Sequence, residues 1–240
     1  MRRNRMMDWP VIDSGVREYL RSQQKELPGK LNELQEEAGQ RRVPVIPHES
    51  VVFLDWLFDL IQPEEVLEVG TAIGFSALLM AERVTENGHV TTIERNPQMI
   101  EEARANIAEF NMQDKITVLE GDAAECLQTL KGPYDFIFMD SAKAKYPEFF
   151  PDIMKLLKVG GVLAVDDVLQ GGTIMYDEKF IPKRVRKIHR KLNEFLDEVL
   201  THDSLKSTLL PLGDGLLMIT KKEEHDFSYM KSSADDQRNL

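Results

Sequence analysis

Three acidic residues directly follow two apolar segments in the second half of the chain. Asp140 follows residues 136–139, and Asp166 and Asp167 follow residues 162–165. If these segments are neighbouring strands of a parallel sheet, their carboxyl ends lie at one edge and the three carboxylates meet there. Carboxylates that meet without a partner repel each other, and all-oxygen ligands suit Mg²⁺, with Mn²⁺ or Ca²⁺ as alternatives. We therefore expect a divalent-metal site, although Asp166 or Asp167 taken alone is better explained as a cap.

A lysine lies three residues beyond the first of these acids. Lys143 is near enough along the chain to pair with the carboxylates, to accept a proton or to stabilise an oxyanion, and it is the candidate catalytic residue. Cys126 is the only cysteine, which excludes an internal disulfide and a cysteine-based zinc site. No cationic partner is evident near it, so we interpret it as a small buried residue.

A glycine-containing turn follows the first apolar segment of the main domain. Residues 68–76 read Glu-Val-Gly-Thr-Ala-Ile-Gly-Phe-Ser, in which Gly70 and Gly74 allow a ligand to approach the backbone. The spacing differs from the glycine pattern of dinucleotide-binding turns, and the lysine of a phosphate-binding loop is missing. Alone, such glycines are often simple turn glycines.

Two further segment ends strengthen the interpretation of that turn. Glu94 lies twenty residues after Gly74, where a carboxylate can accept both hydroxyls of a ribose, although it could equally open the next helix. Asp122 and Ala123 follow the third segment and suit an adenine edge. Together these residues favour an adenosine-containing cofactor without a pyrophosphate.

Short β-branched segments alternate with helical stretches behind these residues. The expected strands are 66–69, 90–93, 116–119, 136–139 and 162–165, with helices at 75–84, 97–110, 123–130 and 146–157. Such alternation predicts an α/β fold with a parallel sheet covered on both faces. A helix at 182–200 and a hairpin of residues 207–210 and 216–220 are expected to close the sheet edge.

Three regions are expected along the chain. Residues 1–45 form a helical extension, with Ser14 as the cap of its first helix, and a further helix is expected at 48–61. Residues 46–222 form the main domain, and residues 223–240 form a polar tail that is expected to be disordered.

Composition places the chain among ordinary globular proteins. Hydrophobic residues make up 42% of its 240 residues and charged residues 30%, and no apolar run approaches the ~18 residues that cross a bilayer. The basic N-terminus is followed by Asp8 and Pro10, where a signal peptide would be apolar. We therefore expect a cytoplasmic protein without a membrane segment.

One segment is strongly basic, although the net charge of −11 argues against a protein that coats nucleic acid. Residues 179–191 contain seven Lys or Arg residues and no acid. A solvated helix face is the usual explanation of such a run, but its density favours contact with a polyanion. The candidate RNA-binding residues are Lys183, Arg184, Arg186, Lys187 and Arg190.

The motifs carry a family resemblance when they are taken in order. Residues 68–76, 92–95, 121–123, 140–143 and 165–168 resemble those of the cation-dependent S-adenosylmethionine O-methyltransferases, which include the catechol and caffeoyl-CoA enzymes. The resemblance spans about residues 40–220 and implies a Rossmann-like class I methyltransferase fold, a mostly parallel seven-stranded sheet and a homodimer. Within the family, residues 43–46, 134–138, 182–184 and 211–216 look most similar to the bacterial tRNA 5-hydroxyuridine methyltransferases, which make 5-methoxyuridine at the wobble position.

The resemblance implies a role for each candidate residue. Binding of S-adenosylmethionine would involve Ile46, Glu68, Gly70, Ser76, Glu94, Asp122, Ala123 and Asp140, with Glu94 on the ribose and Asp122 and Ala123 at the adenine. Mg²⁺ would be held by Asp140, Asp166 and Asp167. The family usually has Asn at the position of Asp167. A third carboxylate is expected to bind the metal more tightly and to leave it a weaker Lewis acid.

The expected reaction is in-line transfer of a methyl group from a sulfonium to a hydroxyl oxygen. Both catechol and 5-hydroxyuracil carry vicinal oxygens that chelate a metal, so metal chemistry does not choose between them. The basic run favours 5-hydroxyuridine in the single-stranded anticodon loop of a tRNA. The alternative is a small catechol-type or caffeoyl-CoA-like phenol. A non-catalytic binding protein is disfavoured because Asp140, Lys143 and the glycine turn are present.

Overall fold

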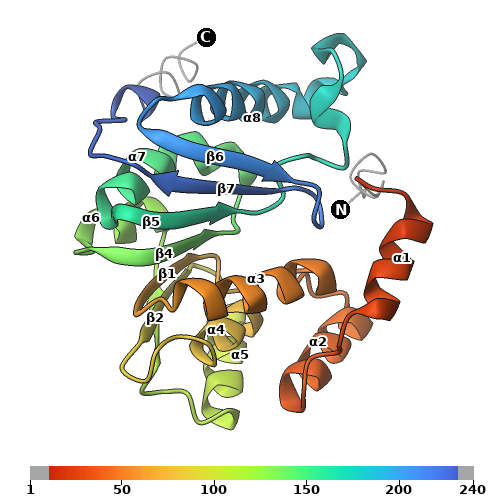
Figure 1. Cartoon of the computed structure of the whole chain (residues 1–240), viewed down its shortest axis with the longest axis vertical. Coiled ribbons are helices and arrows are strands. Elements are labelled where there is room, and N and C mark those ends of the chain that lie inside the picture. Colours follow the sequence, from red (N-terminus) through yellow and green to blue (C-terminus); the bar gives the residue numbers. More distant parts are fainter. Residues whose placement is uncertain (1–10, 232–240) are drawn as a thin grey trace.

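The computed structural model describes residues 11–231, which form one seven-stranded sheet with helices on both faces (Figure 1). The strands are β1 (Glu65–Val69), β2 (His89–Glu94), β3 (Ile116–Glu120), β4 (Tyr134–Met139), β5 (Leu157–Val165), β6 (Leu205–Leu210) and β7 (Leu216–Lys221). Their order is β3-β2-β1-β4-β5-β7-β6. Strands β1 to β5 pair in parallel, and β7 is antiparallel to both of its neighbours. The predicted α/β fold with a mostly parallel seven-stranded sheet is confirmed.

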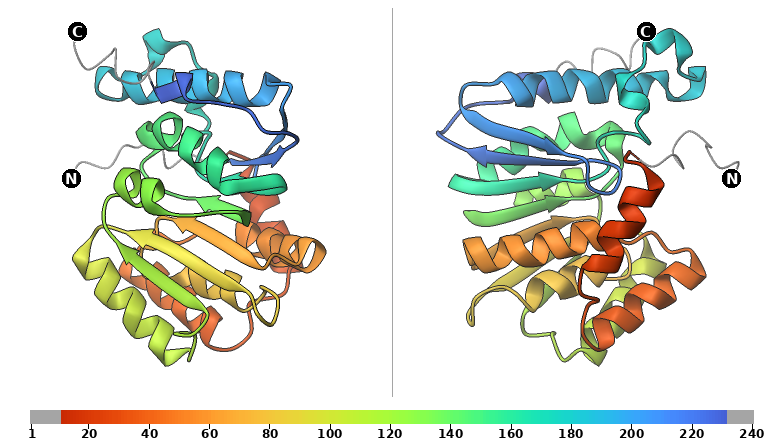
Figure 2. Two further views of the ribbon diagram at one scale, coloured as in Figure 1. Left: turned by 90° about the vertical axis from the view of Figure 1, so that its left-hand side faces the viewer. Right: turned by 45° about the vertical axis from the view of Figure 1, so that its right-hand side comes forward.

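Alternate side chains of the central strands enter two separate cores. Val66 of β1 packs on the same side as Phe136 of β4, whereas Leu67, Val69 and Ile137 point to the opposite side. One face is covered by α2 (Lys30–Arg41), α3 (His48–Ile61), α4 (Phe75–Ala81) and α5 (Pro97–Glu109). The other face is covered by α6 (Ala123–Thr129), α7 (Tyr146–Leu156) and α8 (Lys183–Thr201), as Figure 2 shows. Because both faces are covered, β4, β5 and β7 are largely apolar.

The order of the strands fixes where a ligand can bind. From β1 the chain moves outward to β3 and then returns to β4 on the other side of β1, so the loops after β1 and β4 diverge at the centre of the sheet. Such a divergence opens a crevice at the carboxyl ends of the strands. In Figure 1 these ends of β4 and β5 lie at the right of the sheet.

The first helix has a different N-terminal cap from the predicted one. Helix α1 (Ser14–Gln23) is capped by Asp13, whose carboxylate accepts hydrogen bonds from the amides of Gly15 and Val16, and not by Ser14. Its contact with α3 includes an ion pair between Arg21 and Glu49, 2.8 Å apart. Helix α3 has the bounds predicted for it.

Strand β5 begins five residues earlier than predicted because it contains a bulge. Tyr134 pairs with Leu157 and Phe136 with Val162, so β5 advances five residues while β4 advances two. The extra residues include Gly160, whose φ of +83° suits glycine. Gly160 and Gly161 therefore lie within the strand.

The tail departs from the expectation that it is disordered from residue 223. Phe227 and Met230 are buried, and the ring of Phe227 lies 5.1 Å from that of Phe150 on α7. These two apolar residues, three apart in a mostly polar segment, attach residues 223–231 to the core. The rest of the expected tail, residues 232–240, and the basic N-terminus with Asp8 and Pro10 lie outside the described residues. From residue 11 to residue 231, no helix has the length and apolarity that crossing a membrane requires.

Candidate active site

The loops that follow β1 to β5 surround a cavity of about 410 Å³ at the carboxyl end of the sheet. Each of the five loops contributes at least one lining residue, although the loops are far apart in the sequence. The predicted site residues that line the cavity are Gly70, Glu94, Asp122, Ala123, Asp140 and Asp167. The structure therefore brings most of the predicted cofactor residues into one place.

The turn after β1 packs directly against the loop after β4. Gly70 has a φ of +113°, and its amide donates to the carbonyl of Ile93 at 3.0 Å. A Cβ atom at Gly70 would overlap with the carbonyl oxygen of Asp140. Only glycine allows both this backbone angle and this close approach, which explains why the turn begins with glycine.

The carboxylates at the ends of β2 and β3 are held by backbone amides. Glu94 accepts hydrogen bonds from the amides of Ala72, Arg95 and Asn96 at 2.9–3.0 Å. Asp122 caps α6 through a bond from the amide of Ala124. Both side chains thus have fixed orientations at the cavity. Glu94 Oε2 and Asp122 Oδ1 each accept one amide bond and retain a further lone pair for a ligand.

Glu68 lies below the turn and is completely buried. Its Oε2 accepts a bond from the hydroxyl of Thr92 at 2.5 Å, while Oε1 has no hydrogen-bond partner among the described residues. Burial raises the pKa of Glu68 to about 7, and the nearby hydroxyls of Ser76 and Thr92 limit the rise. Ser76 itself lies in the first turn of α4 and, like Glu68, does not line the cavity.

Ile46 is the predicted cofactor residue that the structure places elsewhere. Its side chain is buried in the core beside α2 and α3, and Pro44, two residues earlier, lines the cavity instead. Residue spacing alone does not tell which side chain of an irregular segment faces a ligand. Arg95, Lys145 and Phe149 also line the cavity and were not predicted.

The three acids proposed as metal ligands share one corner of the site. Burial and the charge of Asp167 raise the pKa of Asp140 to about 7, and Lys143 partly offsets this rise. Burial and the other two carboxylates raise the pKa of Asp166 well above its ordinary value. Asp167 has a φ of +61°, a conformation that Asp and Asn tolerate better than most residues. Its amide donates to the Asp166 carboxylate at 2.8 Å.

The donor atoms of these acids do not converge on a single point. Within residues 11–231, no three His, Cys, Asp or Glu side chains come together in a ready metal-binding geometry. The chemistry of the set nevertheless fits a hard divalent cation, because two buried carboxylates with raised pKa values are otherwise costly to ionise. The metal-binding role of Asp140, Asp166 and Asp167 stays a prediction.

Lys143 connects this corner to a distant turn. Its Nζ lies 2.8 Å from the carboxylate of Asp214 and 3.3 Å from that of Asp167. Asp214 belongs to the turn between β6 and β7 and also accepts a hydrogen bond from the amide of Gly171. Sequence reasoning identified Lys143 but missed Asp214, because no local pattern connects residues 71 positions apart.

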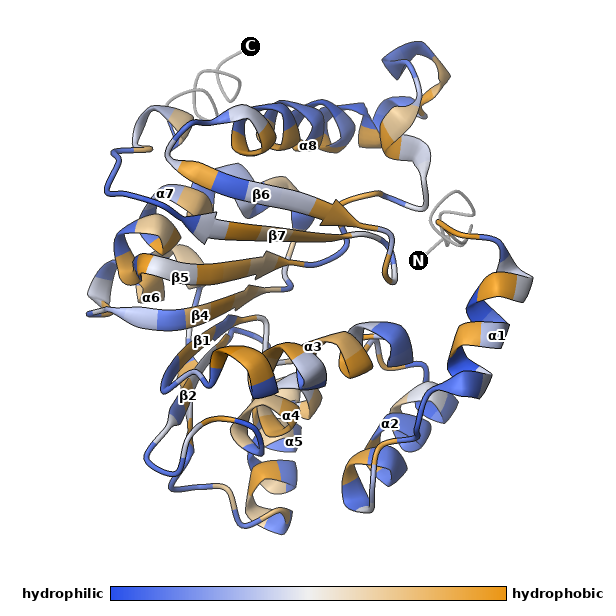
Figure 3. Ribbon diagram, in the orientation of Figure 1, coloured by the Kyte–Doolittle hydropathy of each residue, from blue (hydrophilic) through white to orange (hydrophobic). Residues whose placement is uncertain are grey.

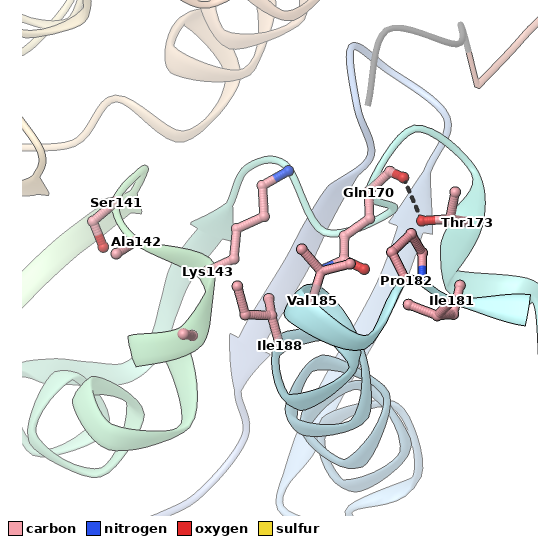
Figure 4. A pocket seen from close by; sticks show the side chains of 10 residues that line it. Ser141, Ala142, Lys143, Gln170, Thr173, Ile181, Pro182, Val185 and Ile188 are labelled. Carbon is pink, nitrogen blue, oxygen red and sulfur yellow. Dashed lines mark hydrogen bonds between the residues drawn. The ribbon is translucent and has the colours of Figure 1, made fainter. Parts of the chain in front are cut away.

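A second cavity of about 340 Å³ lies beside Lys143. Its walls come from the loop after β4, the segment after β5 and the first turns of α8, and most of its lining side chains are apolar (Figure 4). Ile181, Pro182 and Val185 face it from the α8 side, and Ser141 contributes to both cavities. The hydroxyl of Ser141 is buried and has no hydrogen-bond partner among the described residues. Such an atom is free to bind a ligand.

The candidate RNA-binding residues do not form a uniform surface. Lys183, Arg184 and Lys187 are exposed near the start of α8. Arg186 is turned to the backbone, where it donates to the carbonyls of Ile181 and Lys179 at 2.8 and 3.2 Å. Arg190 lies 4.0 Å from Glu178. Figure 3 shows the hydrophilic side of α8 turned away from the sheet.

The order of the strands, the reversed β7 and the cavity at the ends of β1 to β5 define a class I methyltransferase fold. A family model described as O-methyltransferase matches residues 21–222. The protein therefore belongs to the O-methyltransferase family, as its motifs predict.

Known relatives agree with this family. The caffeoyl-CoA O-methyltransferase of Stellaria longipes is 30% identical over 172 residues, which are 68% of this chain and 70% of that protein. The catechol O-methyltransferase of Mycobacterium tuberculosis is 36% identical over 124 residues, 51% of this chain and 56% of that one. A Podospora anserina methyltransferase solved with S-adenosylhomocysteine has a TM-score of 0.77 at 25% identity, covering 87% of this chain and 94% of that one.

Proposed function

We propose that this protein transfers a methyl group from S-adenosylmethionine to a hydroxyl oxygen. Support comes from the family, from the S-adenosylhomocysteine in the Podospora anserina relative and from the cavity at the strand ends. Glu94 Oε2 retains a lone pair for a ribose hydroxyl, and Asp122 and Ala123 offer polar and apolar contacts to the adenine. Glu68 is buried below the turn and outside this cavity, so we assign it no direct contact with the cofactor.

The chain's own residues would position the acceptor. When bound, S-adenosylmethionine would supply the methyl group as a sulfonium, and a divalent cation held by Asp140, Asp166 and Asp167 would lower the pKa of the acceptor hydroxyl. The apolar walls beside Lys143 would exclude water from an acceptor held there. Because the ammonium of Lys143 pairs with two carboxylates, its position suits stabilisation of an oxyanion better than proton removal.

The substrate that we propose is 5-hydroxyuridine at the wobble position of a tRNA. The observation that carries this proposal is that exposed Lys183 and Arg184 directly follow Ile181 and Pro182, which line the Lys143 cavity. A base turned out of a single-stranded loop into this cavity would bring its flanking phosphates beside these cations.

A small phenol is the second candidate acceptor. It is favoured by the names of the relatives, which are caffeoyl-CoA and catechol O-methyltransferases. A free catechol would need the apolar cavity and the metal but not the exposed cations. The two candidates therefore differ in their dependence on Lys183 and Arg184.

A methyl-transfer assay separates the two candidates. Purified protein with S-adenosylmethionine and Mg²⁺ is offered a tRNA containing 5-hydroxyuridine and, separately, a free catechol. Mass spectrometry of the nucleosides is expected to detect 5-methoxyuridine, and EDTA is expected to abolish it. Methylation of the catechol alone would contradict the tRNA substrate while leaving the O-methyltransferase activity in place.

We also propose that the protein is a homodimer. Val16 and Tyr19 on α1, and Trp56 and Leu60 on α3, are exposed apolar side chains on two helices that contact each other. Burial of these side chains against a second copy would remove them from water. Light scattering is expected to give twice the chain mass, and a monomer mass at micromolar concentration would contradict the proposal.

A further inference from the structure

The segment that connects β5 to α8 exposes three large apolar side chains. Met175, Tyr176 and Phe180 are 76%, 40% and 68% exposed. Met175 ends the short 3₁₀ turn η3 (Thr173–Met175), Tyr176 directly follows it, and Phe180 ends a second turn, η4 (Glu178–Phe180). None of these three side chains packs into either hydrophobic core. A local concentration of exposed apolar groups of this kind marks a contact surface.

Hydrogen bonds fix the segment at both ends. The Thr173 hydroxyl donates to the carbonyl of Gln170 at 2.7 Å, and Asp177 caps η4 through the amide of Lys179. At the other end, Arg186 donates to the carbonyls of Lys179 and Ile181. The exposed rings are therefore presented from a defined backbone conformation.

A cation lies over one of the exposed rings, and two more follow it in the sequence. Lys179 Nζ lies 5.0 Å from the centre of the Phe180 ring, and Lys183 and Arg184 follow within four residues. The two acids of the segment lie beside cations, since Asp177 is 3.0 Å from Lys179 and Glu178 is 4.0 Å from Arg190. The surface thus combines aromatic faces with positive charge in a chain whose net charge is −11.

The segment is continuous with the cavity beside Lys143. Thr173 and Ile181, at its two ends, line that cavity (Figure 4). In Figure 1 the segment projects beyond the start of α8, on the side of the molecule where β4 and β5 end. The exposed side chains thus belong to a segment whose two ends form part of the cavity wall.

On the basis of the RNA substrate proposed above, we propose that Tyr176 and Phe180 form a stacking platform for unpaired bases next to the methylated nucleotide. Lys183 and Arg184 contact the phosphates that flank those bases. Aromatic rings interleaved with cations suit single-stranded RNA because every base has a π face and every nucleotide a phosphate. A purely apolar protein partner would gain nothing from the cations.

The test measures binding of a fluorescently labelled anticodon stem–loop that contains 5-hydroxyuridine. Phe180→Leu keeps an apolar side chain but removes the ring, and is expected to raise the Kd about tenfold, whereas Phe180→Trp is expected to keep it near the wild-type value. Tyr176→Leu is compared with Tyr229→Leu, which removes a similarly exposed ring near the other end of α8. Only the first of these two variants is expected to weaken binding. Thermal melting confirms that each variant is folded.

Salt dependence distinguishes stacking from phosphate contacts. Phe180→Leu is expected to keep the slope of log K against log salt concentration, and Lys183→Gln with Arg184→Gln to reduce it by about one to two. If the wild-type protein methylates the stem–loop but Phe180→Leu and Tyr176→Leu bind it like the wild type, the platform is wrong and the proposed function stands. If the wild-type protein neither binds nor methylates the stem–loop, both proposals fall.

Discussion

Lys143 Nζ and the carboxylate of Asp214 are 2.8 Å apart, although the two residues are 71 positions apart in the sequence. The same carboxylate accepts a hydrogen bond from the amide of Gly171. Asp214 therefore joins three loops at the carboxyl end of the sheet: the loop after β4, the segment after β5 and the turn between β6 and β7. The position of the candidate catalytic lysine depends on this turn.

Asp214→Asn is expected to lower kcat about tenfold with little change in cofactor affinity. The amide oxygen of Asn can still accept from Gly171, but the charge that holds Lys143 is lost. Steady-state kinetics and S-adenosylmethionine titration measure the two effects. Asp203→Asn, at an exposed position before β6, is the matched control. An unchanged kcat in Asp214→Asn would mean that the ion pair does not position Lys143 for the reaction.

Lys143→Met is expected to lower kcat by about a hundredfold or more, because either role considered for Lys143 contributes on that scale. Lys143→Arg decides between the two roles. A guanidinium keeps the positive charge but does not accept a proton at neutral pH, so partial recovery indicates stabilisation of an oxyanion. No recovery indicates a general base. Full activity of Lys143→Met across the pH range would remove the residue from the mechanism.

The sequence was sufficient to predict the sheet and most of the cofactor cavity. The alternation of apolar segments and helices predicts parallel strands, and the loops that follow parallel strands meet at one edge. Gly70, Glu94 and Asp122 could be predicted for this reason, since each directly follows a strand.

The residues that the sequence did not identify depend on tertiary packing. Asp214 lies in an ordinary glycine-flanked turn, and only folding brings it to Lys143. Pro44 and Ile46 are two residues apart in an irregular segment, and packing alone decides that Pro44 faces the cavity while Ile46 enters the core. The sequence showed that residues 179–191 are rich in positive charge. It did not show that Arg186 is turned toward backbone carbonyls.

Gly70→Ala is expected to destabilise the fold by several kcal/mol. The added methyl group would overlap with the Asp140 carbonyl, and a φ of +113° strains any residue other than glycine. Gly160→Ala is the matched control, because Gly160 also has a positive φ of +83° but has no atom within 4 Å of the added Cβ. Its cost is limited to about 1–2 kcal/mol of backbone strain. Urea unfolding measures the free energy of unfolding of both variants. Equal losses in the two variants would contradict the close approach of Gly70 to the Asp140 carbonyl.

Glu68→Gln is expected to change how stability depends on pH. The pKa of Glu68 is about 7 in the folded protein against 4.5 as its ordinary value, so the folded state binds more protons between these values. The free energy of unfolding therefore falls as pH rises from about 4.5 to 7, by about 3 kcal/mol at most. Gln does not titrate. The melting temperature of the variant minus that of the wild type should therefore be larger at pH 8 than at pH 5. An equal difference at both pH values would show that Glu68 ionises normally.

Asp167→Asn tests the metal site with the residue that the family usually has there. Removal of one charge weakens the attraction for Mg²⁺, and we expect the Kd from calorimetry to rise about tenfold. The same change removes the charge of Asp167 that raises the pKa of Asp140, so Asp140 should ionise at lower pH.

Binding of Mg²⁺ to the wild-type protein should weaken as pH falls through about 7, because a ligand must be deprotonated. The Asp167→Asn variant should keep its affinity for Mg²⁺ to lower pH. Asp152→Asn, on α7 and outside both cavities, is the control. Wild-type protein that binds no Mg²⁺ at pH 8 would contradict the site, and identical pH dependence in Asp167→Asn would show that Asp167 does not act on Asp140.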